Sequence, residues 1–246
     1  MNLIGDALAW IFSADPGAGM ASIPAALVEH LVYTFVSVLV AGLIAVPVGW
    51  AIGHTGRGRD VAVALSGAAR AVPSFGLLLL LILVLGVLHK PEAAVITFVL
   101  LAIPSLLAGA YTGFEAIDRA VVDAGRAMGM TGGQVLRRVE IPLGLPLLLG
   151  GVRAATLQVV ATVTIAAYAN LGGLGQYIIT GLNLRRFDMV LGGAILVAVL
   201  ALVLDGAFAL AQRFALPHGV RAAAHRPAVT ARARRRRAMR PLTTPQ

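Results

Sequence analysis

Long apolar runs separated by short polar segments make up most of this chain. A helix needs about 20 apolar residues to cross the hydrocarbon core of a bilayer. Five runs are long enough, and Arg70 and Pro73 interrupt the second. The runs cover residues 31–53, 61–88, 93–114, 143–168 and 189–212. This pattern predicts an all-α, polytopic membrane protein with about five core transmembrane helices, or six if the interrupted run forms two.

The composition agrees with this class. Hydrophobic residues make up 59% of the 246 residues and charged residues only 13%, against about a quarter in soluble domains. Cysteine is absent, so neither a disulfide framework nor a cysteine-ligated metal is expected. The net charge of +9 would suit nucleic acid, but nine of the 20 Lys and Arg residues lie from Arg213 onward. Because the basic residues gather at one end, we expect membrane lipid and not nucleic acid as their partner.

Two segments flank the predicted transmembrane domain, residues 25–213. Residues 1–24 have apolar positions at helical spacing and predict an interfacial amphipathic helix anchored by Trp10, with a frayed terminus as the alternative. Residues 214–246 have almost no bulky apolar side chains and predict a basic, disordered cytoplasmic tail. That tail either attracts anionic lipid or acts only as an orientation signal.

The positions of the arginines predict the orientation, since cytoplasmic loops carry an excess of Lys and Arg. With the amino end outside, the inner loops carry Arg57, Arg59, Arg119, Arg126, Arg137 and Arg138. The outer loops then carry only Lys90, Arg185 and Arg186. We therefore expect the N-terminus outside and the C-terminus inside, which puts the polar stretch between the third and fourth runs in the cytoplasm.

That polar stretch, residues 123–142, reads DAGRAMGMTGGQVLRRVEIP. It starts as a short helical run with small residues along one side: Ala124, Gly125, Ala127 and Gly129. Small side chains let a second surface approach closely. A glycine-containing turn is predicted at 131–133, and Pro142 suits the first turn of the next helix. The stretch has the form of a docking element.

Its spacing resembles the cytoplasmic loop of ATP-binding-cassette (ABC) importer permeases: Glu-Ala-Ala, three residues, Gly, nine residues, then Ile-x-Leu-Pro. Asp replaces Glu and Gly replaces the second Ala, and these departures keep charge or small size. The resemblance implies an ATPase-coupling loop over residues 115–142. Its coupling residues would be Asp123, Ala124, Gly125, Gly129, Val139, Ile141 and Pro142.

Two longer segments carry a more specific resemblance. MGMTGGQVLRRVEIPL at 128–143 and VVATVTIAAYANLGGLGQYIITGL at 159–182 are similar to the permease subunits of glycine betaine, choline and proline importers. Methionine-importer permeases share the architecture. The resemblance implies a type I ABC importer permease fold in the plasma membrane. It also implies three partners: cytoplasmic ABC ATPases, a second permease chain, identical or related, and an extracytoplasmic substrate-binding protein.

Motifs for enzymatic chemistry are missing from the sequence. Lys90 is the only lysine, and no glycine-rich run precedes it, so a phosphate-binding loop for ATP is absent. The five histidines are scattered at loops and ends, and we assign none of them as a metal ligand. We expect a transport subunit that is not an enzyme and has no cofactor or metal of its own. ATP and Mg would be bound by the partner ATPase.

Ionisable residues inside apolar runs are costly and seldom idle. Arg153 and Asp205 are predicted at similar depth, roughly 12–17 Å from the cytoplasmic end at the helical rise of about 1.5 Å per residue. Our hypothesis is that they approach each other across the fourth and fifth helices. The alternative is that Arg153 snorkels to lipid head groups while Asp205 faces a polar crevice.

A translocation pathway needs polar groups and irregular backbone. Candidates, including aromatic faces for a quaternary ammonium ligand, are Ser74, Phe75, Tyr111, Thr162, Thr164, Tyr168 and Asn170. Ordinary helix packing is the alternative for each of them. We expect the permease subunit of an ATP-driven importer of osmoprotectants such as glycine betaine, choline or proline. The alternatives are a methionine-type or other small amino-acid importer, and a carrier or channel that works without ATP.

Overall fold

The computed structural model describes residues 2–13, 17 and 19–215, and all the regular elements among these residues are helical. The predicted tail therefore lies outside the described residues, except at its first two positions, which extend the last helix. In chain order the elements are α1 (Leu3–Phe12), α2 (Ile23–Thr55), α3 (Arg59–Ala71), α4 (Ser74–Leu85), η1 (Val87–His89), α5 (Lys90–Glu115), α6 (Arg119–Ala127), α7 (Gly132–Val135), η2 (Leu136–Glu140), α8 (Ile141–Ala166), η3 (Ala167–Ala169), α9 (Gly175–Leu184) and α10 (Phe187–Ala215).

Four helices in the described part of the chain are long and apolar enough to cross a membrane, and they contain α2, α5, α8 and α10. The pair α3 and α4 forms a fifth candidate span that is bent by 85°. The bend falls at Val72 and Pro73, because proline lacks the N–H that would continue the helix and disfavours helical backbone in the residue before it. The prediction of an all-α protein with about five core spans is confirmed.

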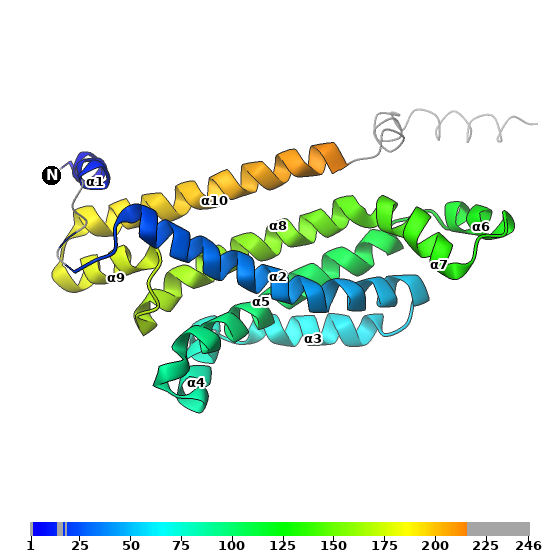
Figure 1. Cartoon of the computed structure of the whole chain (residues 1–246), viewed down its shortest axis with the longest axis horizontal. Helices are drawn as coiled ribbons and strands as arrows, with labels where there is room; N and C mark the ends of the chain where they lie inside the picture. The colour runs from blue at the N-terminus through cyan, green and yellow to red at the C-terminus, as the bar shows by residue number, and fades with distance from the viewer. Residues whose placement is uncertain (1, 14–16, 18, 216–246) are drawn as a thin grey trace, which may run out of the picture.

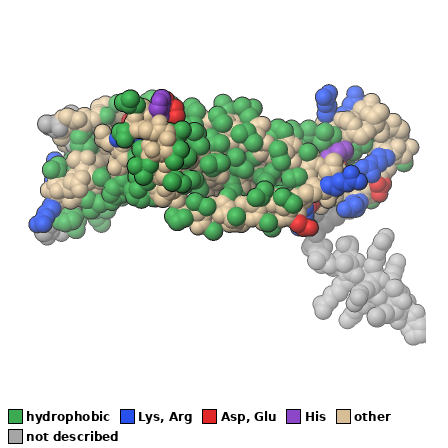
Figure 2. Space-filling view, turned by 90° about the horizontal axis from the view of Figure 1, so that it is seen from below, with side chains coloured by type: hydrophobic (Ala, Val, Ile, Leu, Met, Phe, Trp, Pro, Cys, Tyr) green, Lys and Arg blue, Asp and Glu red, His purple; other side chains and the backbone are tan. Residues whose placement is uncertain are grey.

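The long helices run along the longest axis of the molecule (Figure 1). At one extremity lie α6 and α7, and we call it the α6 end; at the other lie α1 and α9, and we call it the α9 end. Figure 2 shows apolar side chains across the middle of one face, with Lys and Arg side chains gathered at both extremities. This distribution is typical of a body that spans a bilayer and has both ends in water.

Small residues bring α2, α5 and α8 into close contact. A Cβ added at Gly49 of α2 would lie 2.5 Å from the Cβ of Ala110, on α5. A Cβ at Gly109 of α5 would lie 2.8 Å from the Cα of Gly151, on α8. Membrane helices associate through such small-residue contacts, because lipid provides no hydrophobic drive between helices. The central helix α5 therefore fixes the positions of α2 and α8.

Two features near the N-terminus differ from the sequence prediction. Helix α2 begins at Ile23, not near residue 31, with Pro24 in its first turn. Trp10 was expected at the membrane interface but is 4% exposed, with its ring centroid 5.2 Å from that of Tyr177. It also packs against Gly192 of α10, where a Cβ would collide with the indole. The absence of a side chain at Gly192 leaves room for the ring, so Trp10 packs inside the protein.

Candidate functional site

The polar stretch between α5 and α8 folds into two short arms. The first is α6, whose N-terminal N–H group at Ala120 is capped by the Asp118 carboxylate. The second is α7, which begins with a capping box between Thr131 and Gln134. It continues through the π-helical η2 into α8. We call the segment from Asp118 to Glu140 the two-armed loop; it lies at the α6 end, beyond the long helices (Figure 1).

The turn between the arms differs from the prediction. Gly132 and Gly133 were expected to break the first helix, but they are the first residues of α7. The chain reverses instead around Gly129, whose φ of +82° lies in the left-handed region that favours glycine. A Cβ at Gly129 would meet no atom within 4 Å, so the backbone conformation and not crowding selects glycine here.

Two of the predicted coupling residues lie inside the loop. Gly125 is buried, and a Cβ there would lie 3.4 Å from the Met130 sulfur, 3.8 Å from Val135 Cγ2 and 4.0 Å from Val139 Cγ2. Gly125 and Val139 thus hold the two arms against each other. The absence of a side chain at Gly125 leaves room for the second arm. The sequence had suggested that Gly125 faces outward, toward a second surface, and the structure places it inside the loop.

The outer surface of the loop carries small and apolar side chains next to charged ones. Asp123, Ala124 and Gly129 are exposed. Val121 and Met128 are also exposed, at 45% and 77% of their surface. Arg126 lies 3.9 Å from Asp123 in an exposed ion pair. Ile141 and Pro142 open α8, with Pro142 in the first turn as predicted.

The base of the two-armed loop is joined to α2 by a contact that the sequence did not reveal. His54 Nδ1, near the end of α2, lies 2.5 Å from Glu140 Oε2, although the two are 86 residues apart in sequence. Glu140 is only 5% exposed and ends η2, where α8 begins. This pair connects the loop to α2 as well as to α8.

Arg153 of α8 and Asp205 of α10 meet, as their predicted depths suggested. Arg153 Nε donates to Asp205 Oδ1 and Nη2 donates to Oδ2, both at 2.6 Å. Each side chain is 33% exposed. Two parallel hydrogen bonds between a guanidinium and a carboxylate are strong and directional. The pair fixes α10 against α8.

The candidate pathway residues do not form one cluster. Tyr111 is buried in the core, beside Gly49 and Gly53 of α2. Thr162 and Thr164 donate to carbonyl groups four residues earlier in their own helix, Gln158 and Val160. The hydroxyl groups of Thr162 and Thr164 are thus bonded within their own helix.

The other pathway candidates lie toward the α9 end. The rings of Phe75 and Tyr168 have centroids 5.6 Å apart, which brings α4 together with η3, the turn directly after α8. Tyr168 is 59% exposed. Ser74 begins α4, directly after the 85° bend. Asn170 is exposed and left-handed, with φ of 59°.

A second junction, at the α9 end, was also missed by the sequence. His30 is fully buried; its Nε2 lies 3.1 Å from the Val160 carbonyl oxygen, and its Nδ1 accepts from Leu174 N at 3.3 Å. The neighbouring Glu29 Oε2 accepts from Gly173 N at 2.9 Å. The only signal for this junction was two ionisable residues beside an apolar run, where such groups need partners.

Metal-site geometry is not found in the part of the chain that the structure describes: no group of three or more His, Asp or Glu side chains there is arranged to hold an ion. The two histidine junctions each use a single imidazole with hydrogen-bonding partners.

Relatives and solved structures are similar to most of the chain. The glycine betaine/carnitine/choline transport system permease protein OpuCB of Bacillus subtilis is 32% identical over 78% of this chain and 88% of its own. The osmoprotectant import permease protein OsmW of Salmonella typhimurium is 32% identical over 78% of this chain and 91% of its own. A chain of the MetNI methionine ABC transporter, solved in inward-facing conformations, superposes with a TM-score of 0.70 and 22% identity. The superposition covers 79% of this chain and 96% of that one.

The structural likeness establishes the fold, that of a type I ABC importer permease, which confirms the predicted architecture. The model of the family described as binding-protein-dependent transport system inner membrane component matches residues 40–215. That match includes α5, the two-armed loop, α8 and α10. The chain is therefore a multi-pass membrane protein that belongs to the family of binding-protein-dependent transport system inner membrane components.

Proposed function

We propose that this chain forms the translocation pathway of an ATP-driven importer of osmoprotectants such as glycine betaine, choline or proline. The observation that carries the proposal is the two-armed loop, a compact, capped element at one extremity of a body with an apolar middle. Such an element serves no purpose in lipid. It is suited to bind a partner in water.

In this proposal the exposed face of α6, with Val121, Ala124 and Met128, docks in a groove of a cytoplasmic ABC ATPase. The ATPase hydrolyses ATP and holds its Mg. ATP binding can shift the permease between inward-open and outward-open states only through a difference in affinity for the two. The loop joins α2 through His54 and α8 through Glu140. Movement of the ATPase would therefore move both helices.

The α6 end is then cytoplasmic and the α9 end faces outward. The predicted inner arginines, such as Arg59 and Arg138, lie toward the α6 end, and Lys90, Arg185 and Arg186 lie toward the α9 end. This arrangement follows the excess of positive charge in cytoplasmic loops. The remaining partners are a second permease chain, identical or related, an extracytoplasmic substrate-binding protein and membrane lipid.

The cargo is supported by the relatives, which are named for transport of glycine betaine, carnitine, choline and osmoprotectants. The methionine-importer likeness, at 22% identity, supports the fold more than the cargo. A carrier that works alone would place several ionisable groups at the middle of the membrane. Here the paired Arg153 and Asp205 bond to each other.

The test is uptake of radiolabelled substrate into proteoliposomes that contain the permease, its cognate ATPase and its binding protein. ATP-dependent entry of glycine betaine, choline or proline, without entry of methionine, is expected. Entry of methionine alone would support the alternative importer. Entry of any substrate in the absence of the ATPase would contradict the proposal that ATP drives import.

A further inference from the structure

We propose that a polar recess at the α9 end is a binding site for a zwitterion, with Glu29 and Tyr33 holding a quaternary ammonium group and Lys90 holding a carboxylate. The inference rests on the proposed function and extends it to a specific site.

The recess has a volume of about 410 Å³ and lies between α2, the start of α5 and the glycine loop before α9. Small-molecule sites in proteins begin at about 300 Å³. Its polar side chains come from all three segments: Glu29, Tyr33, Lys90, Asn170 and Gln176. Among the described residues, no ion pair joins Glu29 to Lys90, so the two opposite charges line one space without neutralising each other directly.

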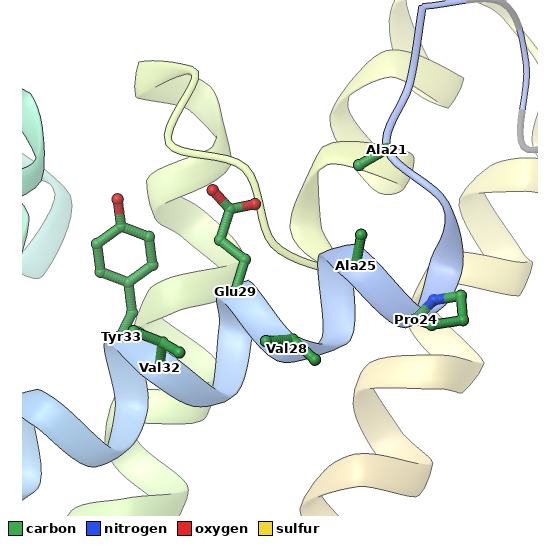
Figure 3. A pocket seen from close by; sticks show the side chains of 7 residues that line it. All are labelled: Ala21, Pro24, Ala25, Val28, Glu29, Val32 and Tyr33. Carbon is green, nitrogen blue, oxygen red and sulfur yellow. The ribbon is translucent and has the colours of Figure 1, made fainter.

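Glu29 and Tyr33 also line a second, larger recess of about 810 Å³ along α2, whose other lining residues are apolar. Figure 3 shows their side chains next to each other, projecting in the same direction from α2. A quaternary ammonium group cannot donate a hydrogen bond, and it is recognised by a carboxylate and by aromatic faces. Methyl groups and positive charge would therefore both find partners here.

The Glu29 carboxylate is held in place by the protein. It accepts from Gly173 N at 2.9 Å and lies so close to Gly172 that a Cβ there would collide with it. One backbone hydrogen bond leaves further acceptor capacity on a carboxylate. A group positioned in advance loses less entropy when ligand binds.

Lys90 gives the recess its selectivity. An ammonium group is a compact point charge that attracts a carboxylate, and the amide of Asn170 is an additional donor. Glycine betaine and carnitine carry a carboxylate as well as a quaternary ammonium group, whereas choline carries only the latter. The recess should therefore prefer the zwitterions to choline.

Lys90 is the only lysine of the chain, which makes a direct test possible. The permease–ATPase complex in lipid nanodiscs is treated with an amine-acylating reagent, and acylation of Lys90 is followed by mass spectrometry. Glycine betaine should slow acylation of Lys90 at least threefold and choline should not. Glu29→Gln, which keeps the size and an acceptor for Gly173, should abolish the protection. Equal acylation rates with and without glycine betaine, for a complex that imports glycine betaine in proteoliposomes with its binding protein, would overturn the proposal.

Uptake provides the second readout. Lys90→Gln should lower the ratio of glycine betaine to choline import by about threefold, the size expected when a partly exposed ion pair is lost. Arg185→Gln is the matched control, since it removes an exposed cation at the same end outside the recess. If both variants change the import of glycine betaine and of choline to the same extent, the residues act on binding-protein docking and the proposal fails. If the wild type imports neither substrate, the proposed function fails, and the recess is judged by the acylation result alone.

Discussion

The two ends of α2 are each held by a histidine, but the two junctions differ in kind. At the α9 end His30 is fully buried and contacts the Val160 carbonyl and the Leu174 N–H, which are backbone groups. At the α6 end the His54 side chain is 26% exposed and contacts the Glu140 carboxylate. Val160 and Glu140 lie at opposite ends of α8. Helix α2 is thus fastened to α8 twice.

The difference indicates a division of labour. If His30 separated from its partners, the Leu174 N–H would stay buried without its hydrogen bond, which is costly. If His54 separated from Glu140, the partly exposed imidazole would keep contact with water, although the Glu140 carboxylate, 7% exposed, would lose its partner. We infer that the α9 junction stabilises the fold, while the α6 junction passes on movement of the two-armed loop.

The largest effect is expected from His30→Leu. It leaves the Leu174 N–H unpaired, at about 1–3 kcal/mol, and removes one of the contacts of the Val160 carbonyl, which still accepts from Thr164. Thermal unfolding of the purified permease, followed by tryptophan fluorescence, should show a clear loss of stability. His89→Leu, at the same end but exposed, is the control and should change little. Equal stability of both variants would remove the distinction between the junctions.

The next effect concerns Arg153 and Asp205, which lie between the two junctions and connect α8 to α10. Arg153→Ala and Asp205→Ala should each lower the melting temperature, because each leaves a charge without its partner. The double variant should lose less than the sum of the two single losses. Additive losses would mean that the pair contributes no coupling.

A smaller effect on stability, but a large one on transport, is expected from Glu140→Gln. The amide keeps the size of the side chain and loses its charge, so the connection between His54 and the loop weakens. The melting temperature should change less than for His30→Leu. ATP-driven uptake should fall while ATP hydrolysis continues. If uptake and hydrolysis fall together, the α6 junction has a structural role like that of His30.

The smallest effect is expected from Asp123→Asn. The Arg126 contact is 3.9 Å long and exposed on both sides. Such pairs contribute about 0–1 kcal/mol. Stability should be unchanged within error, and a loss of ATPase binding in a pull-down experiment would show that Asp123 acts on the partner surface and not on the fold.

The sequence predicted the spans and the Arg153–Asp205 contact for physical reasons. Bilayer thickness sets the length of each apolar run, and an ionisable pair at equal depth has few other ways to avoid lipid. The position of the two-armed loop followed from its polarity and spacing. These features depend on local pattern or on depth, and both can be read from one chain.

The two histidine junctions depend on contacts that local pattern does not reveal. His54 and Glu140 are 86 residues apart, and His30 and Leu174 are 144 apart. Nothing in the spacing of either histidine indicates its partner. The inner position of Gly125 was also hidden, because a small residue fits a contact within the loop as well as a contact with another protein.

The most direct test of the account compares Gly129→Asp with Gly133→Asp in ATP-dependent uptake of glycine betaine by the reconstituted importer. Both glycines have open space around a Cβ, but only Gly129 needs the left-handed backbone, which costs other residues about 1–2 kcal/mol. Gly129→Asp should abolish most of the uptake while the permease remains folded, and Gly133→Asp should retain it. Equal uptake by the two variants would contradict coupling through the two-armed loop.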